Sequence, residues 1–251
     1  MSSIRSSLAH SLVLRRIRAR LPYRVKNWRT KALKYWQWES DTEEVLANHV
    51  CGPNQTLSSI DDRRDSIVWA LEPTTDDVCL DIGCAVGRVE KHLAPLVKEV
   101  HAVDFSKAML SLAQARLNEF PNVRLYQNDG ESLPMFADEM FDLAWAELIF
   151  HHVPIEITEG YLKEIARVLK PEGRFICQLP LSSFYRLYSR GVCGWLTTQE
   201  AERLMKRHFG EVAVSDDGRH ILARGRLPIR TRAQKSAFVP STSDRDSYTH
   251  Y

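Results

Sequence analysis

Three aspartates could act together in ligand binding, because each stands at or just beyond the carboxyl end of an expected strand. They are Asp81, Asp104 and Asp129. A glycine-containing loop at residues 83–87 follows the first of these strands and precedes a helix, and open α/β sheets bind ligands at such turns. Carboxylates at this edge can accept hydrogen bonds from ribose hydroxyls or attract a positive charge. The pattern predicts one ligand-binding crevice.

The elements that must position these acids alternate between strand and helix from residue 77 onward, which is typical of a doubly wound parallel sheet. Thr197 and Glu200 have capping-box spacing, and Asp217 with Gly218 predicts a hairpin between strands at 212–214 and 220–224. The other expected strands lie at 78–82, 99–103, 123–127, 141–146 and 174–178, and the expected helices at 88–96, 106–120, 158–169 and 197–208.

The loop sequence GCAVGR discriminates between two kinds of cofactor. A dinucleotide-binding loop carries glycines at positions one, three and six, and counted from Gly83 these positions hold Gly83, Ala85 and Arg88. The Arg88 side chain would obstruct close packing of helix on strand. Acids around the crevice suit a cofactor that has a positive charge and no phosphate. These features favour S-adenosylmethionine (SAM).

Five segments resemble, in order and spacing, the class I SAM-dependent methyltransferases, particularly the type 11 methyltransferase-domain group. The resemblance covers roughly residues 60–225 and implies a Rossmann-like, doubly wound, seven-stranded, mostly parallel sheet with an antiparallel last strand. It also implies an enzyme that uses SAM as its methyl donor. The segments are VCLDIGCAVGRVEKHLA (78–94), VHAVDFSKAMLSLAQARL (100–117), NVRLYQNDGESLP (122–134), FDLAWAELIFHHVP (141–154) and YLKEIARVLKPEGRF (161–175).

The resemblance further implies cofactor contacts at this edge. Asp104 would hold the ribose hydroxyls, Asp129 would face the adenine amino group, and the loop would line the methionine part. As alternatives, Asp81 and Asp104 could each cap a helix, and Glu147 could orient the acceptor or lie on the surface. The candidate cofactor-binding residues are Asp81, Gly83, Cys84, Ala85, Gly87, Asp104, Phe105, Asp129, Gly130 and Glu147.

Two histidines, His151 and His152, follow the fourth expected strand on the side where a methyl acceptor would lie. Either imidazole could deprotonate an acceptor hydroxyl or amine, with packing beneath the next helix or capping its end as alternatives. The sulfonium methyl group is already electrophilic, so the enzyme mainly aligns the reacting atoms and excludes water. No metal site is expected, because His and acidic residues do not cluster at ligand spacing.

Ala85 replaces the middle glycine of the family pattern, and Glu172 replaces the first glycine of the usual Pro-Gly-Gly turn, where only local geometry should change. A required positive φ at Ala85 would cost on the order of 1 kcal/mol. If glycine serves only for close approach, a small shift of the loop could accommodate the methyl group. We favour accommodation, because SAM has no pyrophosphate to press against the loop. A catalytically silent SAM-binding protein is the competing hypothesis.

Charge divides the chain unevenly. Of its 34 Lys and Arg residues, ten lie in a basic N-terminal arm at 1–38 that has no acid, so residues 39–251 carry 24 basic and 32 acidic residues. We expect a helical N-terminal cap at 39–72, the methyltransferase domain at 73–226 and a polar, disordered tail at 227–251. The arm could be a frayed helix, an organelle transit peptide, a helix lying through residues 1–34 on an anionic membrane, or a handle for nucleic acid.

Composition and the fourth strand restrict the setting and the acceptor. No apolar run reaches the roughly 18 residues of a membrane span, and five cysteines without a CxxC pair indicate a reducing, cytoplasmic compartment, with peripheral membrane attachment or organelle targeting left open. Residues 146–149 lack the Asp-Pro-Pro-aromatic turn of enzymes that methylate exocyclic amines of bases. The preferred acceptor is a small molecule, such as a lipid, sugar or natural-product intermediate, ahead of RNA or protein. The oligomeric state is not indicated.

Overall fold

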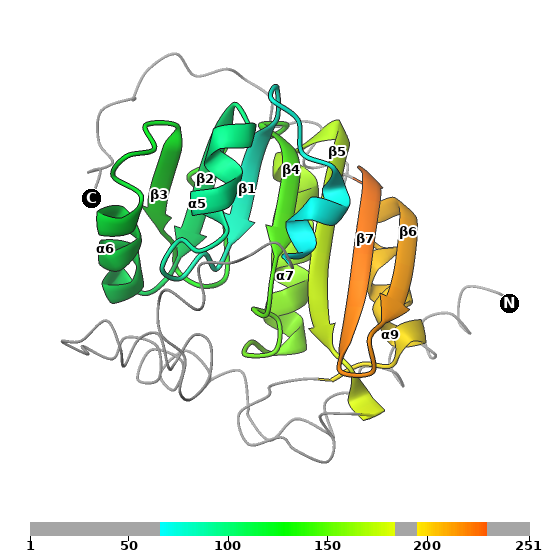
Figure 1. Cartoon of the computed structure of the whole chain (residues 1–251). Coiled ribbons are helices and arrows are strands. Elements are labelled where there is room, and N and C mark those ends of the chain that lie inside the picture. Colours follow the sequence, from blue (N-terminus) through cyan, green and yellow to red (C-terminus); the bar gives the residue numbers. More distant parts are fainter. Residues whose placement is uncertain (1–65, 184–194, 230–251) are drawn as a thin grey trace, which may run out of the picture.

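A seven-stranded sheet forms the centre of the computed structural model, which describes residues 66–183 and 195–229 (Figure 1). The strands are β1 (Val78–Ile82), β2 (Glu99–Asp104), β3 (Val123–Gln127), β4 (Phe141–Ala146), β5 (Leu169–Pro180), β6 (Phe209–Asp216) and β7 (His220–Pro228). Their order in the sheet is β3-β2-β1-β4-β5-β7-β6. The first five strands run parallel, and β7 is antiparallel to both β5 and β6. The expected Rossmann-like fold is confirmed.

Helices cover both faces of this sheet. Figure 1 shows η1 (Ile67–Leu71), α5 (Glu90–Leu93) and α6 (Lys107–Arg116) on one face and α7 (Ile155–Val168) and α9 (Thr198–Met205) on the other. A short 3-10 turn, η2 (Ala94–Leu96), follows α5 directly. Because strand side chains alternate between faces, Leu80 and Ile82 of β1 pack with α7, whereas Cys79 packs with η1 and α5. Asp81 therefore faces the η1 and α5 side.

The strand register gathers the predicted site at one edge. Ile82 pairs with Val103, and Asp104 pairs with Gln127, so β1, β2 and β3 end close together. Asp104 ends β2, and the 83–87 loop and residues 129 and 147 follow β1, β3 and β4, so all of them lie at the same, carboxyl-terminal edge. Ligands bind at this edge in open parallel sheets.

Helix boundaries differ from the sequence prediction where backbone geometry intervenes. The helix expected at 88–96 begins two residues later, at Glu90. The left-handed backbone of Gly87 (φ 76°) leaves residues 88 and 89 in a turn. The helix expected at 158–169 begins at Ile155, because Pro154 has the fixed φ of a helix start. Ser106 caps α6 as predicted, its Oγ accepting from the Met109 amide. The capping box at Thr197 and Glu200 is also present.

Of the segments expected outside the methyltransferase domain, only the end of the cap and the start of the tail lie among the described residues. The arm at 1–38 and most of the cap at 39–72 lie outside them, as do residues 230–251. The described end of the cap, η1, shares a buried core with Leu143 and Trp145 of β4. Residues 227 and 228, expected in the tail, belong to β7. No helix in the described ranges is both long enough and apolar enough to span a membrane.

Candidate active site

The loop between β1 and α5 has left-handed backbone at three alternate positions. Gly83 has φ 80°, Ala85 has φ 49° and Gly87 has φ 76°. The Gly83 and Cys84 amides both donate to the Val103 carbonyl, at 2.8 and 3.1 Å, which fixes the loop against β2. Ala85 therefore occupies the conformation that disfavours a Cβ atom, and the preferred expectation of simple accommodation was wrong. The residue carries a conformational cost of about 1 kcal/mol.

The two glycines also allow close packing. A Cβ atom on Gly83 would collide with the Ile149 side chain from the β4–α7 connection. One on Gly87 would lie 2.5 Å from Leu117 Cδ1, at the end of α6. Gly87 therefore allows the loop to pack closely against the end of α6. Gly83 allows it to pack against the segment that follows β4. The Cys84 side chain between them is buried, and burial raises the pKa of its thiol, so it is no activated nucleophile.

Asp104 connects the loop to the start of α6. Its Oδ2 accepts from the Ala85 amide at 3.0 Å and its Oδ1 from the Ser106 amide at 2.8 Å. The side chain is 8% exposed, and burial raises its pKa to about 6 although these amides favour the charged form. Each carboxylate oxygen has a second lone pair. The residue can thus cap the backbone, as the alternative interpretation held, and still accept a hydroxyl.

The carboxyl group of Asp81 lies in contact with that of Glu90, an acid that the sequence interpretation missed. Asp81 is 5% exposed and Glu90 is fully buried. Burial, followed by the charge of Glu90, raises the pKa of Asp81 well above its usual range, and burial raises the pKa of Glu90. A sequence signal was present, because Glu90 lies between Val89 and Leu93, which mark the buried face of the helix.

Glu147 joins the end of β4 to η1. Its Oε2 accepts a 2.7 Å hydrogen bond from Ser66 Oγ, and that same hydroxyl accepts from the Val68 amide at the start of η1. The charge of Glu147 contributes to the raised pKa of Asp81. Leu148, the next residue, has φ 59°. Glu147 is thus half-buried, with its charge close to Asp81, and does not lie on the open surface.

Asp129 closes the turn after β3 and is exposed. Its Oδ1 accepts from the amides of Glu131 (2.9 Å) and Ser132 (2.7 Å), and its Oδ2 accepts from Ser132 Oγ at 2.9 Å. Gly130 is buried with φ 79°, and the half-buried Phe105 packs on the core. These three residues lie at the expected edge, and the Asp129 carboxylate already has a structural function there.

His151 lies in a group of imidazoles. Its ring centroid is 5.0 Å from that of His220, at the start of β7, and 6.2 Å from that of His152. Burial, with the nearby imidazoles, lowers the pKa of His151 to about 3, and burial lowers that of His152 to about 4. Both rings are therefore neutral near pH 7, and the same burial makes each a weaker base than an exposed imidazole. His220, whose Nδ1 lies 3.3 Å from Asp217 Oδ2, was missed because β5–β7 pairing brings it here.

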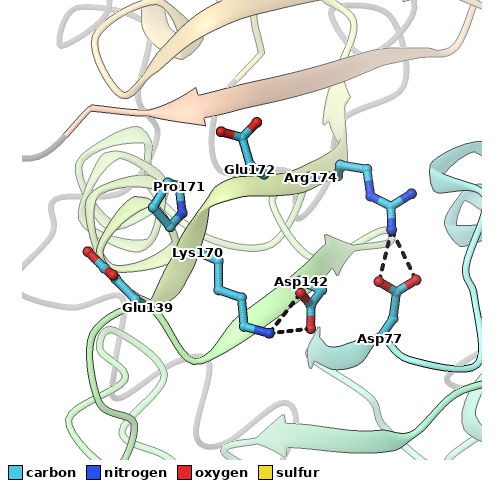
Figure 2. A pocket seen from close by; sticks show the side chains of 7 residues that line it. All are labelled: Asp77, Glu139, Asp142, Lys170, Pro171, Glu172 and Arg174. Atoms are coloured by element: carbon cyan, nitrogen blue, oxygen red, sulfur yellow. Dashed lines mark hydrogen bonds and ion pairs between the residues drawn. The ribbon is translucent and has the colours of Figure 1, made fainter.

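A cavity of about 590 Å³ lies at the opposite edge of the sheet, where β1 and β4 begin (Figure 2). Lys170 Nζ lies 2.8 Å from both carboxylate oxygens of Asp142, and Arg174 Nη2 lies 3.0 Å from both of Asp77. The two cations of this cavity thus each pair with an aspartate. Glu172 is exposed here, far from the crevice as the sequence predicted, but it lies within β5 rather than in a turn before that strand.

Residues 80–177 match a family model described as a methyltransferase domain. The chain is 37% identical over 99 residues to the uncharacterized methyltransferase YcgJ of Bacillus subtilis, covering 39% of this chain and 38% of that protein. It is 31% identical over 132 residues to a demethylmenaquinone methyltransferase of Bacillus licheniformis, covering 50% of this chain and 56% of that protein. The chain thus spans between 38% and 56% of the length of these relatives.

A solved structure of similar fold is phosphoethanolamine N-methyltransferase 1 of Haemonchus contortus, in complex with phosphoethanolamine and S-adenosylhomocysteine. The TM-score is 0.64 at 17% identity, and the match covers 82% of this chain and 50% of that one. The crystal structure of the YcgJ protein gives a TM-score of 0.52 at 21% identity, covering 66% of this chain and 97% of that one. At such identities the similarity establishes the fold.

Proposed function

We propose that the protein transfers a methyl group from SAM to an acceptor bound beside the 83–87 loop, because residues 80–177 match a methyltransferase-domain family model. The observation that supports this most is the charge at the loop. Asp81, Glu90 and Asp104 are all buried next to it. SAM carries a sulfonium and an ammonium group, and buried carboxylates stabilise positive charge when it replaces water.

Each candidate residue has a role in this proposal. Asp81 faces the ammonium group of the methionine part, and the loop backbone at Gly83 and Ala85 lies beside the chain of the cofactor. Asp104 accepts the ribose hydroxyls through the lone pairs that the two amides leave available. Phe105 and Gly130 border the adenine. The other proposed contacts with the cofactor are made by Cys84, Gly87, Asp129 and Glu147.

SAM supplies an electrophilic methyl group, so the chain has mainly to orient the acceptor and exclude water. The acceptor lone pair forms a bond to the methyl carbon as the bond from carbon to sulfur breaks, which leaves S-adenosylhomocysteine. When the acceptor atom carries a proton that must leave, neutral His151 or His152 accepts it. The low pKa keeps both rings neutral at pH 7 but makes each a weak base, so in this proposal the ring takes the proton only as the acceptor becomes acidic in the transition state.

The acceptor is a small molecule in this proposal, either a lipid, a sugar or a natural-product intermediate. One relative is named for demethylmenaquinone, and the structural neighbour of highest TM-score among those described above holds phosphoethanolamine. Both names are of small molecules. An RNA or protein acceptor, held by the basic arm, is the alternative.

The acceptor class is tested with SAM labelled in its methyl group, incubated with cell extract that has been separated into lipid, polar small-molecule, RNA and protein fractions. We expect label in one of the small-molecule fractions, and none when Asp81→Asn replaces the native chain. Label confined to RNA or protein would overturn the acceptor class. Binding of SAM without transfer to any fraction would support the silent-binder hypothesis.

The basic arm requires a separate experiment, since it lies outside the described residues. A chain lacking residues 1–34 is compared with the full chain for binding to vesicles of anionic lipid and to RNA. We propose the anionic membrane surface as the partner, so deletion should remove vesicle binding in low salt and leave RNA binding unchanged. Loss of RNA binding alone would instead favour the nucleic-acid alternative.

A further inference from the structure

Glu90 extends from the first turn of α5 toward Asp81 on β1. Its side chain is fully buried, and neither of its carboxylate oxygens receives a well-formed hydrogen bond from any residue in the described ranges. Its contact is with another carboxyl group, that of Asp81. Two buried carboxylates in contact repel each other strongly when both are charged, so such a pair retains one shared proton.

The surroundings of this pair keep the proton in place. Most of the neighbouring groups are acidic, and the loop thiol between them is neutral because its own pKa is raised. Arg88, which precedes α5, supplies positive charge toward Glu90. The titratable and charged groups that face the pair are Asp104 from β2, Glu147 just after β4, Cys84 from the loop and Arg88.

Packing alone gives no reason for an acid at position 90. Its neighbours on the buried face, Val89 and Leu93, are apolar and belong to the core between α5 and the sheet. Burying a carboxyl group without full hydrogen bonding costs stability, and an apolar residue would fill the same space without that cost. An unsatisfied acid directed at the cofactor edge is instead a favourable partner for a ligand that brings a cation.

We propose that Asp81 and Glu90 act as one proton-sharing pair that binds the α-ammonium group of the cofactor and releases its proton when the cofactor enters. Before binding, the pair has one proton and one negative charge. In the complex both carboxylates are ionised beside the ammonium group, and the proton passes to the solvent. No covalent bond of the cofactor changes in this step. The inference rests on the proposed function and adds Glu90 as a positioning residue.

The direct test is calorimetric titration with S-adenosylhomocysteine in buffers of different ionisation enthalpy, since the slope of heat against that enthalpy counts released protons. We expect about one proton released where the pair is protonated, and affinity that falls by up to about tenfold for each unit of pH on acidification. Methylthioadenosine is the control ligand, because it has the adenine and ribose but lacks the ammonium group. Any proton lost from Asp104 appears with both ligands, so the difference belongs to the pair.

The outcomes are distinguishable. If S-adenosylhomocysteine binds and releases no more protons than methylthioadenosine from pH 5 to pH 8, the pair does not couple to binding, although the cofactor site stands. If S-adenosylhomocysteine does not bind at all, the proposed function and this inference are both overturned. The wild-type chain is sufficient for both comparisons.

Glu90→Gln adds an independent test. Glutamine preserves the volume and can donate to the Asp81 carboxylate, so Asp81 should be ionised before binding. We expect proton release to fall toward the value measured with methylthioadenosine and the pH dependence of affinity to flatten. Glu172→Gln, at the exposed opposite edge, is the matched control and should release protons as the native chain does. Unchanged release in a folded Glu90→Gln chain would contradict the proposal.

Discussion

The Ala85 amide donates a 3.0 Å hydrogen bond to Asp104 Oδ2, and so connects the left-handed residue of the loop to the acid at the end of β2. The second oxygen of Asp104 holds the Ser106 amide. The acid expected to bind ribose therefore also fixes the loop on which the rest of the cofactor would lie. Binding and loop geometry are coupled through one carboxylate.

Asp104→Ala should weaken both stability and SAM binding. Two buried backbone amides lose their acceptor, which should lower the free energy of unfolding by about 2 kcal/mol or more, and SAM affinity should fall at least tenfold. Denaturant unfolding and calorimetry measure the two effects. Ser106→Ala removes the cap of α6, at about 1 kcal/mol, without removing a predicted cofactor contact, and so serves as the control. A loss of affinity below tenfold would leave Asp104 with only its capping function.

Ala85→Gly should stabilise the chain. Glycine adopts φ near 49° without steric cost, and its greater entropy in the unfolded state offsets part of that gain, so the net increase should be up to about 1 kcal/mol. SAM affinity should stay equal or increase. Ala85→Val should act in the opposite direction, because a β-branched residue is strained further at positive φ. Thermal unfolding of the three chains measures the order, and a less stable Ala85→Gly chain would show that the loop does not require left-handed backbone.

The turnover rate at saturating SAM and acceptor should show no inflection near pH 6.5. The pKa of His151 is lowered to about 3 and that of His152 to about 4, so both imidazoles stay neutral as pH falls from 8 to 5. His151→Gln should reduce the turnover number about a hundredfold when the acceptor must lose a proton. An inflection near pH 6.5 in the native enzyme that His151→Gln abolishes would show that this imidazole titrates normally.

The same low pKa predicts a pH-dependent stability difference. A folded pKa below the unfolded value of 6.5 means that His151 stabilises the fold above pH 6.5, and this contribution is lost as pH falls toward 3. Relative to His151→Gln, the native chain should therefore lose ~2 kcal/mol between pH 7 and pH 5. Denaturant titrations of both chains at the two pH values measure this difference. A difference that does not change with pH would place His151 in a solvated environment.

Much of the sheet could be predicted because its strands are short apolar runs bounded by turn residues. The strands at 78–82, 123–127 and 141–146 have the predicted limits, and the caps at Ser106 and Thr197 depend only on local side-chain to backbone geometry. Helix starts were less accurate. The first turn after the glycine loop depends on the φ of Gly87, which sequence spacing does not specify.

The candidate site was predicted where it follows strand ends and missed where packing between elements forms it. A glutamate on a short helix is usually exposed, and Glu90 is buried only because α5 lies directly over Asp81. His220 reaches His151 through the pairing of β7 with β5, a contact between segments far apart in the chain. Local spacing beside Val89 and Leu93 indicates that Glu90 is buried, but it specifies neither the contact of Glu90 with Asp81 nor that of His220 with His151.

Calorimetric titration of the full chain with SAM, with NAD as the comparison ligand, tests the central claim most directly. We predict saturable one-to-one binding of SAM and no detectable binding of NAD, because Arg88 stands at the position of the last dinucleotide-loop glycine and buried acids surround the loop. Absence of SAM binding at millimolar ligand, or tighter binding of NAD than of SAM, would contradict the assignment of this edge to SAM.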